Sequence, residues 1–457
     1  MQRQNDPWLL TMQITLPLLV LMALNPLPQA RFTTPDQAVR QMLLLEPWHA
    51  ASWDNLLAED AHQANWTQLI SDAGISSGMG LLSDQGKMLW GDAYEQVGQK
   101  SLAVKTWQSA ATVTSSARFE KMLRVQRELN DLDGALATLK QWTILEPQNG
   151  QLYYQAGLLQ SVLSPREAPA ALERALFLDA GYKKQVQILK QALDLDVQGQ
   201  GDAYRQVVVG RALANLNEWV LAHEDFRRAA AEKPDYAEAW AFLGESERQL
   251  GQDDFPSLSK ALALDPHSTA AQSLTARYWI RAGQPDKALA IFQGLVKQEP
   301  KQAVWEIESG DALARMGQPP LAMVHYQNAI NLEPDNPQNW AQLVQFCLKN
   351  DIEVRRIGLP AARRLVMLSP DGADAYDLHG QVLMALGDRD NALQAFFRGL
   401  KMNPVSAQLL LDVGILEISR QEINDASYYL SRAVEAGRQQ KDPVIVQKAQ
   451  ALIDQLQ

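Results

Sequence analysis

The feature that most constrains the fold is a pattern that returns about every 34 residues. Between Ala303 and Asn336 a small residue, an alanine, an aromatic residue and a closing proline follow one another in that order. The closing prolines of successive units keep nearly the same spacing, at Pro234, Pro266, Pro300, Pro334, Pro370 and Pro404. A fixed period of this length indicates a solenoid, which grows by stacking units and not by enlarging one core.

The composition is that of a folded protein with an acidic balance of charge. Hydrophobic residues make up 46% of the 457 residues and charged residues 21%, which argues against a disordered chain. The formal net charge of -11 argues against a nucleic-acid partner, because such binding needs a basic surface. A single cysteine, Cys347, excludes an internal disulfide and any cysteine-based zinc site.

The N-terminal segment contains a long stretch without charge. No charged residue occurs from Pro7 to Ala30, and this stretch is about as long as a bilayer core requires. We predict that residues 1–32 form an uncleaved single-pass anchor, which would make the protein membrane-associated. Pro17 and several polar residues weaken a spanning helix, so two alternatives stay open: a cleaved signal with a secreted or periplasmic product, and a buried or partner-bound helix. Arginines on both sides leave the orientation undecided.

The repeat phase slips once, near the middle of the chain. The separation between Pro147 and Pro234 corresponds to about two and a half units and not to a whole number of them. One extra helix over Tyr182–Asp196, followed by a break at 199–201, accounts for the difference. We therefore predict two lobes, residues 33–198 and 199–440, and a capping helix within 441–457. The glycine- and serine-rich stretch 74–80 is predicted to be a loop.

The units resemble tetratricopeptide repeats. The first-helix signature of that family, a tryptophan followed by Leu-Gly, stands here as Trp240, Leu243 and Gly244. The second-helix signature stands as Ala222, Phe226, Ala229 and Pro234. The resemblance covers most of the chain and implies an all-α fold, an α-solenoid in which roughly ten helix-turn-helix repeats form a right-handed superhelix. One unit, at 358–365, fits only after a two-residue insertion.

Packing explains the small and aromatic residues at these positions. Glycines fall where the first helix of a unit must approach the second closely, at Gly244, Gly310, Gly380 and Gly414. Aromatic residues are expected to fill the space between units, at Phe226, Phe292, Tyr326 and Phe396. Trp240 is expected to be largely buried as well, so that Trp240→Ala would cost about 3 to 5 kcal/mol.

No group of residues has the spacing of a catalytic or metal site. The histidines are scattered among the units without a ligand motif, at His49, His62, His223, His267, His325 and His379. Ser76 lies in a Gly-x-Ser-x-Gly match, but a nucleophile of that type needs a preceding strand, and here both flanks have helical patterns. We expect a protein that is not an enzyme and that uses no cofactor or metal.

In this family the first helices line a concave groove, and arginines gather at the corresponding positions here. They come from successive units and are Arg211, Arg248, Arg277, Arg281 and Arg315. We predict that they form a partner-binding row, which would clamp carboxylates or phosphates of an extended partner. The alternative is that they pair with acidic residues of neighbouring helices, such as Glu245, Glu247, Glu306, Glu308 and Asp311.

The function that follows is a scaffold or adaptor that binds a protein or peptide partner in the groove, while tethered to a membrane by its N-terminus. The partner would be acidic if the arginine row binds it. The second candidate is a regulatory or substrate-presenting subunit of an envelope glycan or polysaccharide complex, with the catalyst on another chain.

Overall fold

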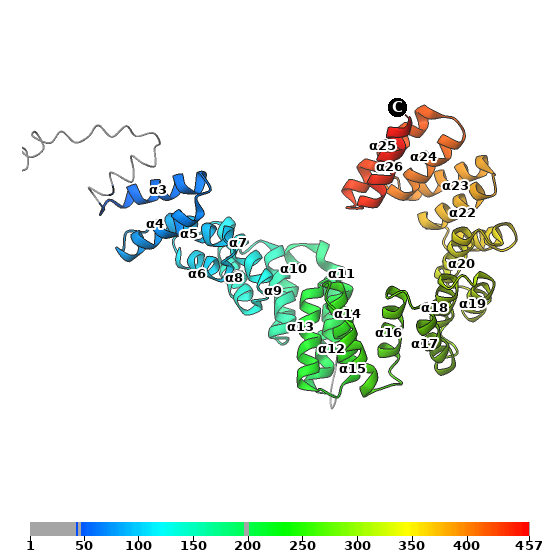
Figure 1. The fold of residues 1–457 in the computed structure, drawn as a ribbon, viewed down its shortest axis with the longest axis horizontal. Helices are drawn as coiled ribbons and strands as arrows, with labels where there is room; N and C mark the ends of the chain where they lie inside the picture. The colour runs from blue at the N-terminus through cyan, green and yellow to red at the C-terminus, as the bar shows by residue number, and fades with distance from the viewer. Residues whose placement is uncertain (1–42, 44–46, 196–200, 457) are drawn as a thin grey trace, which may run out of the picture. The chain divides into compact units, whose positions relative to one another are not determined.

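The computed structural model describes residue 43 and residues 47–195 and 201–456. These residues form 24 α-helices, α3 to α26, and contain no strand, which confirms the predicted all-α repeat fold (Figure 1). The predicted N-terminal anchor, residues 1–32, lies outside the described residues. None of the helices within them has the length and apolar character needed to cross a bilayer.

The chain forms two compact units, Met1–Asp196 and Val197–Gln457. The first unit contains α3 (Ala50–His62), α4 (Trp66–Gly78), α5 (Asp84–Gln96), α6 (Lys100–Ser109), α7 (Ser116–Glu128), α8 (Leu132–Leu145), α9 (Gly150–Leu163), α10 (Ala168–Leu178), the short 3-10 helix η1 (Ala180–Tyr182) and α11 (Lys183–Leu193). The last two elements confirm the extra helix that the phase slip predicted. The lobe boundary at 198 and 199 falls among residues 196–200, outside the described ranges, and stays a prediction.

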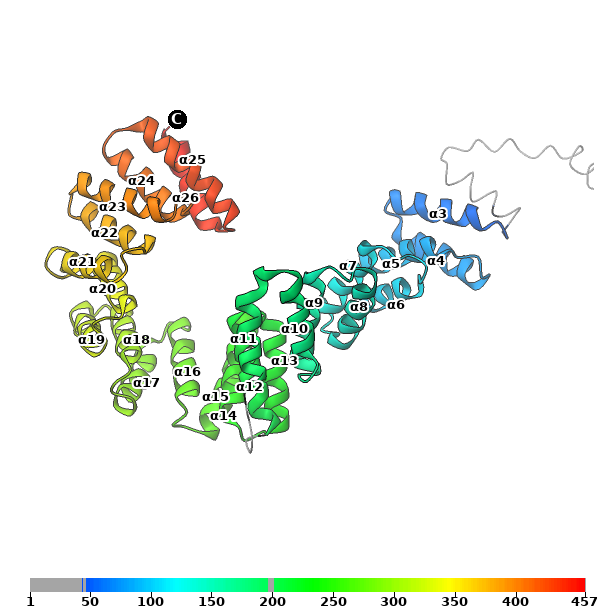
Figure 2. The same ribbon diagram turned by 180° about the vertical axis from the view of Figure 1, so that it is seen from behind.

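The second unit consists of seven helix pairs and a final helix. Its helices are α12 (Asp202–Asn215), α13 (Trp219–Glu232), α14 (Ala237–Gln249), α15 (Phe255–Leu264), α16 (Thr269–Arg281), α17 (Pro285–Gln298), α18 (Ala303–Arg315), α19 (Pro319–Leu332), α20 (Pro337–Asn350), the π-helix η2 (Val354–Gly358), α21 (Leu359–Leu368), α22 (Ala373–Ala385), α23 (Arg389–Met402), α24 (Ala407–Ser419), α25 (Ile423–Gln439) and α26 (Pro443–Leu456). Figures 1 and 2 show α18 and α20 on the inner side of the curve of this unit and α19 on the outer side.

The turn inside each pair has a recurring backbone geometry. Gly317, two residues after α18, has a φ of +72°, and Gly283 and Gly387 adopt +72° and +79° after α16 and α22. Glycine takes this left-handed conformation without steric cost, which ends the first helix. The second helix then starts at a proline in α17 and α19, where the missing N–H group is not needed.

Small residues let the paired helices pack closely. Gly380 of α22 faces the ring of Phe396 of α23, and a Cβ atom at Gly380 would lie 2.4 Å from a ring carbon of Phe396. Gly310 of α18 stands in the same relation to Tyr326 of α19, at 3.0 Å. The aromatic residues predicted to fill the space between units are all buried: Phe226, Phe292, Tyr326 and Phe396.

Trp240 packs against the hydrophobic core of its repeats and is largely buried, as the sequence suggested. The ammonium group of Lys260 lies 3.6 Å from the centroid of its ring. Its indole N–H donates to the carbonyl oxygen of Pro234 at 3.0 Å. Trp340 makes the same bond to Pro334 at 2.8 Å. The tryptophan therefore also fixes the turn between units, and the cost of about 3 to 5 kcal/mol expected for its removal stays a prediction.

The stretch 74–80 is not the loop that its glycines and serines predicted. Helix α4 continues to Gly78, and only Gly80, with a φ of +70°, turns the chain. Ser76 is fully buried and donates its hydroxyl to the carbonyl oxygen of Ala73 at 3.2 Å. Because the Ser76 hydroxyl bonds within its own helix, it is not presented as a nucleophile.

The insertion predicted near 358 takes the form of an irregular turn after α20. Asp351 and Glu353 have φ values of +49° and +50°, and η2 follows as a π-helical turn before α21. At the C-terminus, α26 packs against α25 and α24 through Ile445 and Ala449. The helix predicted there is thus present and covers the last apolar face of the array.

Gly380→Ala is expected to lower the free energy of unfolding by about 1 to 3 kcal/mol, because the new methyl group would overlap the buried ring of Phe396. Gly294→Ala is the matched control: it lies in α17, and a Cβ atom there meets no atom within 4 Å. The control should stabilise the helix by about 0.5 to 1 kcal/mol. Urea denaturation of both variants tests the difference, and an equal effect of the two substitutions would contradict it.

Candidate functional site

A polar pocket opens between two first helices of the second unit. It has a volume of about 310 Å³ and lies between α18 and α20, where Tyr326 of α19 also lines it. Its lining residues are Asp311, Ala314, Arg315, Tyr326, Gln342, Gln345, Phe346, Lys349 and Asn350. This is the inner row of helices in Figures 1 and 2, the row on which the sequence placed the binding arginines.

Two aromatic rings and one carboxylate form the base of this pocket. The rings of Tyr326 and Phe346 lie 4.6 Å apart, and the hydroxyl of Tyr326 donates to Oδ1 of Asp311. Burial, followed by the charge of Asp311, raises the pKa of the Tyr326 hydroxyl. The hydroxyl therefore stays protonated, so that Asp311 keeps a neutral donor.

Two cations face the same pocket without an acidic partner. The side chains of Arg315 and Lys349 are exposed, and neither forms an ion pair with any residue in the described ranges. With Asp311 as the one carboxylate in the lining, the pocket carries a net positive charge in a chain whose net charge is -11. The amides of Gln342 and Gln345 add donors beside the cations.

The other predicted arginines lie on the expected helices, but three of them are already paired. Arg248 bonds to Glu245 at 3.0 Å, Arg277 bonds to Glu308 at 2.7 Å, and Arg281 bonds to Asp254. Arg211 lies over the ring of Phe242, with its guanidinium carbon 5.1 Å from the centroid. Arg277 and Glu308 pair between neighbouring helices as the alternative predicted, whereas Glu245 belongs to the same helix as Arg248 and Asp254 precedes α15. The structure brings none of the other four arginines into the pocket of Arg315.

Lys349 lines the pocket but was not part of the predicted binding row, which contained only arginines. It stands one repeat period after Arg315, as Arg315 stands one period after Arg281, so the same repeat position carries a cation in three successive units. This repeat spacing could have predicted Lys349 from the sequence. The sequence could not predict that Gln342 and Gln345 line the same pocket, because their position depends on how α20 is rotated against α18.

The described residues show no arrangement typical of catalysis. No group of three or more histidine, cysteine, aspartate or glutamate residues among them could hold a metal ion. His325 bonds to Glu306 at 2.5 Å and His223 to Ser246 at 3.1 Å, both between neighbouring helices. Burial raises the pKa of the Cys347 thiol to about 11, which keeps it un-ionised and unreactive at neutral pH.

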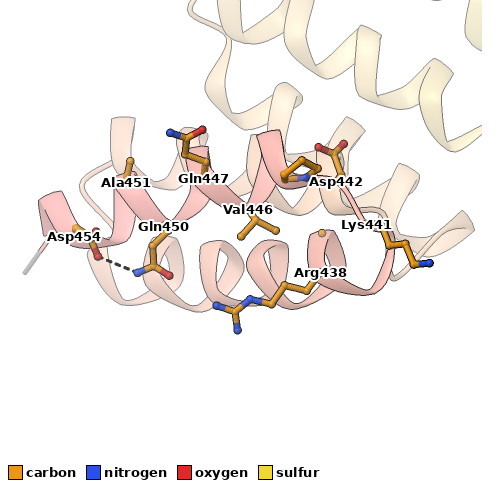
Figure 3. Close-up of a pocket in the computed structure, with 10 residues that line it drawn as sticks. Arg438, Lys441, Asp442, Val446, Gln447, Gln450, Ala451 and Asp454 are labelled. Atoms are coloured by element: carbon orange, nitrogen blue, oxygen red, sulfur yellow. Dashed lines mark hydrogen bonds between the residues drawn. The ribbon is translucent and has the colours of Figure 1, made fainter. Parts of the chain in front are cut away.

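Two larger hollows lie elsewhere. One, of about 670 Å³, follows the groove between the end of α25 and α26, where Val446 and Ala451 supply apolar surface and Gln450 bonds to Asp454 at 2.9 Å (Figure 3). The other, of about 640 Å³, lies between α7 and α9 of the first unit. In the second hollow Arg124 is paired with both Glu95 and Glu128. In the first hollow Arg438 and Lys441 also form no ion pair with a described residue, but two carboxylates, Asp442 and Asp454, share the lining, so that its formal charge is zero and not positive as in the pocket of Arg315.

Comparison with known proteins supports the repeat assignment. Residues 255–309 and 378–441 match family models described as tetratricopeptide repeat. No curated protein matches the chain in sequence.

Solved structures with similar helical arrays include yeast Tom70, which is 12% identical with a TM-score of 0.45 over 81% of this chain and 96% of that one. The Cut9-Hcn1 hetero-tetramer of APC/C is 13% identical with a TM-score of 0.40, over 92% and 98%. A tetratricopeptide repeat protein from Parabacteroides merdae is 15% identical with a TM-score of 0.42, over 55% and 100%.

Tyr326→Phe is expected to lower the free energy of unfolding by about 1.5 to 3 kcal/mol, because it removes a bond to a charged carboxylate from a buried position. Tyr278→Phe is the control, since the hydroxyl of Tyr278 makes no hydrogen bond within the described part of the chain. Urea denaturation of the two variants measures the difference. A loss below about 0.5 kcal/mol for Tyr326→Phe would show that this bond does not hold the base of the pocket.

Proposed function

We propose that this chain, which matches tetratricopeptide-repeat models over residues 255–309 and 378–441, binds an acidic segment of a protein partner along the first helices of its second unit. The proposal rests on one observation, the convergence of Arg315 and Lys349 on one pocket without acidic partners in the described ranges. Single exposed cations are ordinary in proteins. Two that converge with amide donors in a hollow form the kind of polar site that orients a ligand.

The two cations suit a carboxylate in complementary ways. The guanidinium of Arg315 offers a planar pair of N–H donors that matches the two oxygens of a carboxylate, and the ammonium of Lys349 adds a mobile point charge. The hydroxyl of Tyr326 bonds to Asp311, so this carboxylate has a partner other than Arg315. Arg315 therefore stays available for a ligand.

The other four predicted arginines are expected to contribute less to partner binding than Arg315. Arg277 and Arg281 would have to break their bonds to Glu308 and Asp254 before contacting a partner, which offsets much of the gain. Arg248 is neutralised by Glu245, whereas Arg211 forms no ion pair with a described residue and adds positive potential that attracts an acidic segment to the row of first helices. Arg315 is the member of the predicted row that we expect to contact the partner directly.

The backbone conformation after α20 is consistent with a binding site near Lys349. Asp351 and Glu353 adopt left-handed conformations that cost free energy for residues with a side chain, and they lie two and four positions after Lys349. Such strained turns cluster at binding sites, and a π-helical turn such as η2 is often found there too.

We also propose that residues 1–32 tether the array to a membrane, on the basis of the charge-free stretch from Pro7 to Ala30. Expression of the full chain and of a chain that lacks residues 1–32, followed by alkaline extraction of membranes, tests the tether. The full chain should stay in the membrane pellet and the shortened chain should not. Release of both chains would rule out an integral anchor.

The double charge reversal Arg315→Glu with Lys349→Glu tests the binding proposal. The probe is a fluorescein-labelled peptide of alternating glutamate and serine, followed by fluorescence anisotropy with the full chain. Reversal should weaken binding at least about tenfold, which corresponds to about 1.4 kcal/mol. Binding to the parent should also weaken with added salt, because exposed charges are screened.

The matched control is Lys301→Glu with Lys401→Glu, which changes the net charge by the same amount at exposed positions outside the pocket. Binding by the control should resemble that of the parent. An equal loss in both double variants would show attraction by net charge alone, and full binding by the reversed pocket would refute the proposed site.

A further inference from the structure

The groove between α25 and α26 lies on a helix face that is covered in other pairs. Gly310, Gly380 and Gly414 are each the eighth residue of a first helix, and each faces the second helix of its pair. The eighth residue of α26 is Gln450, which is exposed and lines the groove of about 670 Å³. The groove therefore lies where a second helix packs in the other pairs.

The middle of this groove is uncharged. Val446 is half-buried against the core of the last helix pair, and Ala451 beside it is exposed. The amides of Gln447 and Gln450 are exposed on either side of Val446 (Figure 3). An amide carries both N–H donors and an oxygen acceptor, so that two identical amides can bond to each other.

The two ends of the groove carry opposite charges. Arg438 and Lys441 lie towards the end where α26 begins, and neither forms an ion pair with a described residue. Asp442 at the same end caps α26, because its Oδ1 accepts from two backbone N–H groups of the first turn. This end therefore has a net positive charge. Asp454 lies about three turns further along, near the other end of α26 (Figure 3).

A groove with this order of charge is complementary to itself. When two such grooves lie antiparallel about a twofold axis, the cationic end of each meets Asp454 of the other, and the neutral middle meets its own copy. Helix α26 of one copy then lies along the groove of the other. Opposite charges at the two ends also fix the antiparallel direction, because a parallel arrangement would bring like charges together.

We propose that the groove between α25 and α26 is an interface between two copies of this chain, which pair through antiparallel α26 helices about an axis near Gln447 and Gln450. The inference goes beyond the proposed function, since it uses no residue of the pocket of Arg315. One helix pair forms a small interface, so the dimer is expected to be reversible at micromolar protein concentrations.

Charge reversal tests the order of the charges. One variant combines Arg438→Glu with Lys441→Glu, and the other carries Asp454→Lys. Each variant alone should self-associate at least about tenfold more weakly than the parent, because like charges then meet at both ends. An equal mixture of the two variants should associate as the parent does, since each end of one variant then meets an opposite charge on the other. Sedimentation velocity of the full chain, in one detergent throughout, measures the association.

Lys448→Glu is the matched control for charge. Lys448 is an exposed residue of α26 that does not line the groove, so its reversal changes the charge of the same helix outside the proposed interface. Self-association of this variant should equal that of the parent. A comparable loss in the control would show an effect of net charge and not of the groove.

Disulfide formation locates the axis by a second measurement. Gln447→Cys places a thiol near the axis, where it meets the same thiol of the other copy, and oxidation with copper phenanthroline should give a covalent dimer. Lys448→Cys, one position along and outside the groove, should give little. The native Cys347 is fully buried and does not compete.

Three results would overturn the inference. The first is a parent chain that stays monomeric at high micromolar concentration, with no covalent dimer from Gln447→Cys. The second is self-association that both charge variants retain, which would place the interface elsewhere. The third is a loss in each variant without recovery in the mixture, which would contradict the antiparallel arrangement. The glutamate–serine probe measures the pocket of Arg315 separately, so either proposal can fail without the other.

Discussion

The repeat architecture depends on one close contact, between a glycine on the first helix of a pair and a large side chain on the second. Gly310 and Tyr326, Gly380 and Phe396, and Gly414 and Leu430 all show it. The absent Cβ atom allows the helices to approach, and the ring or leucine then fills the space that the next unit also borders. Because the contact recurs at the same repeat position, these first helices lie next to one another along the array.

That row is where the chemistry of the second unit collects. Residues that point away from the paired helix meet residues of the next first helix, so that charges from different repeats converge. Arg315 meets Lys349 at their shared pocket in this way, and Asp377 meets Asp412 through the shared amide of Gln381. The pocket between α18 and α20 contains two cations, whereas α22 and α24 bring two carboxyl groups together. Stacking of units thus brings charged side chains of different repeats together, although no unit carries such a group by itself.

Much of the fold could be predicted from the sequence, because the contacts that define a repeat are local and recur. The positions of buried aromatic residues and the extra helix α11 followed from spacing alone. One prediction was wrong. The stretch 74–80 was judged by its glycines and serines, but α4 continues to Gly78 and buries Ser76, whose hydroxyl bonds within the helix. Packing against neighbouring helices overrode the local preference for a loop.

The sequence by itself determined the class of fold, the repeat length and the helices on which charged residues lie, since these depend on the spacing of apolar and small residues along the chain. Which charges are paired was decided only by the tertiary structure. Arg281 and Arg315 occupy the same repeat position, but the tertiary structure brings Asp254 to Arg281 and Lys349 to the pocket of Arg315. Pairing depends on distances of a few ångströms between residues of different repeats, and the repeat period does not specify such distances.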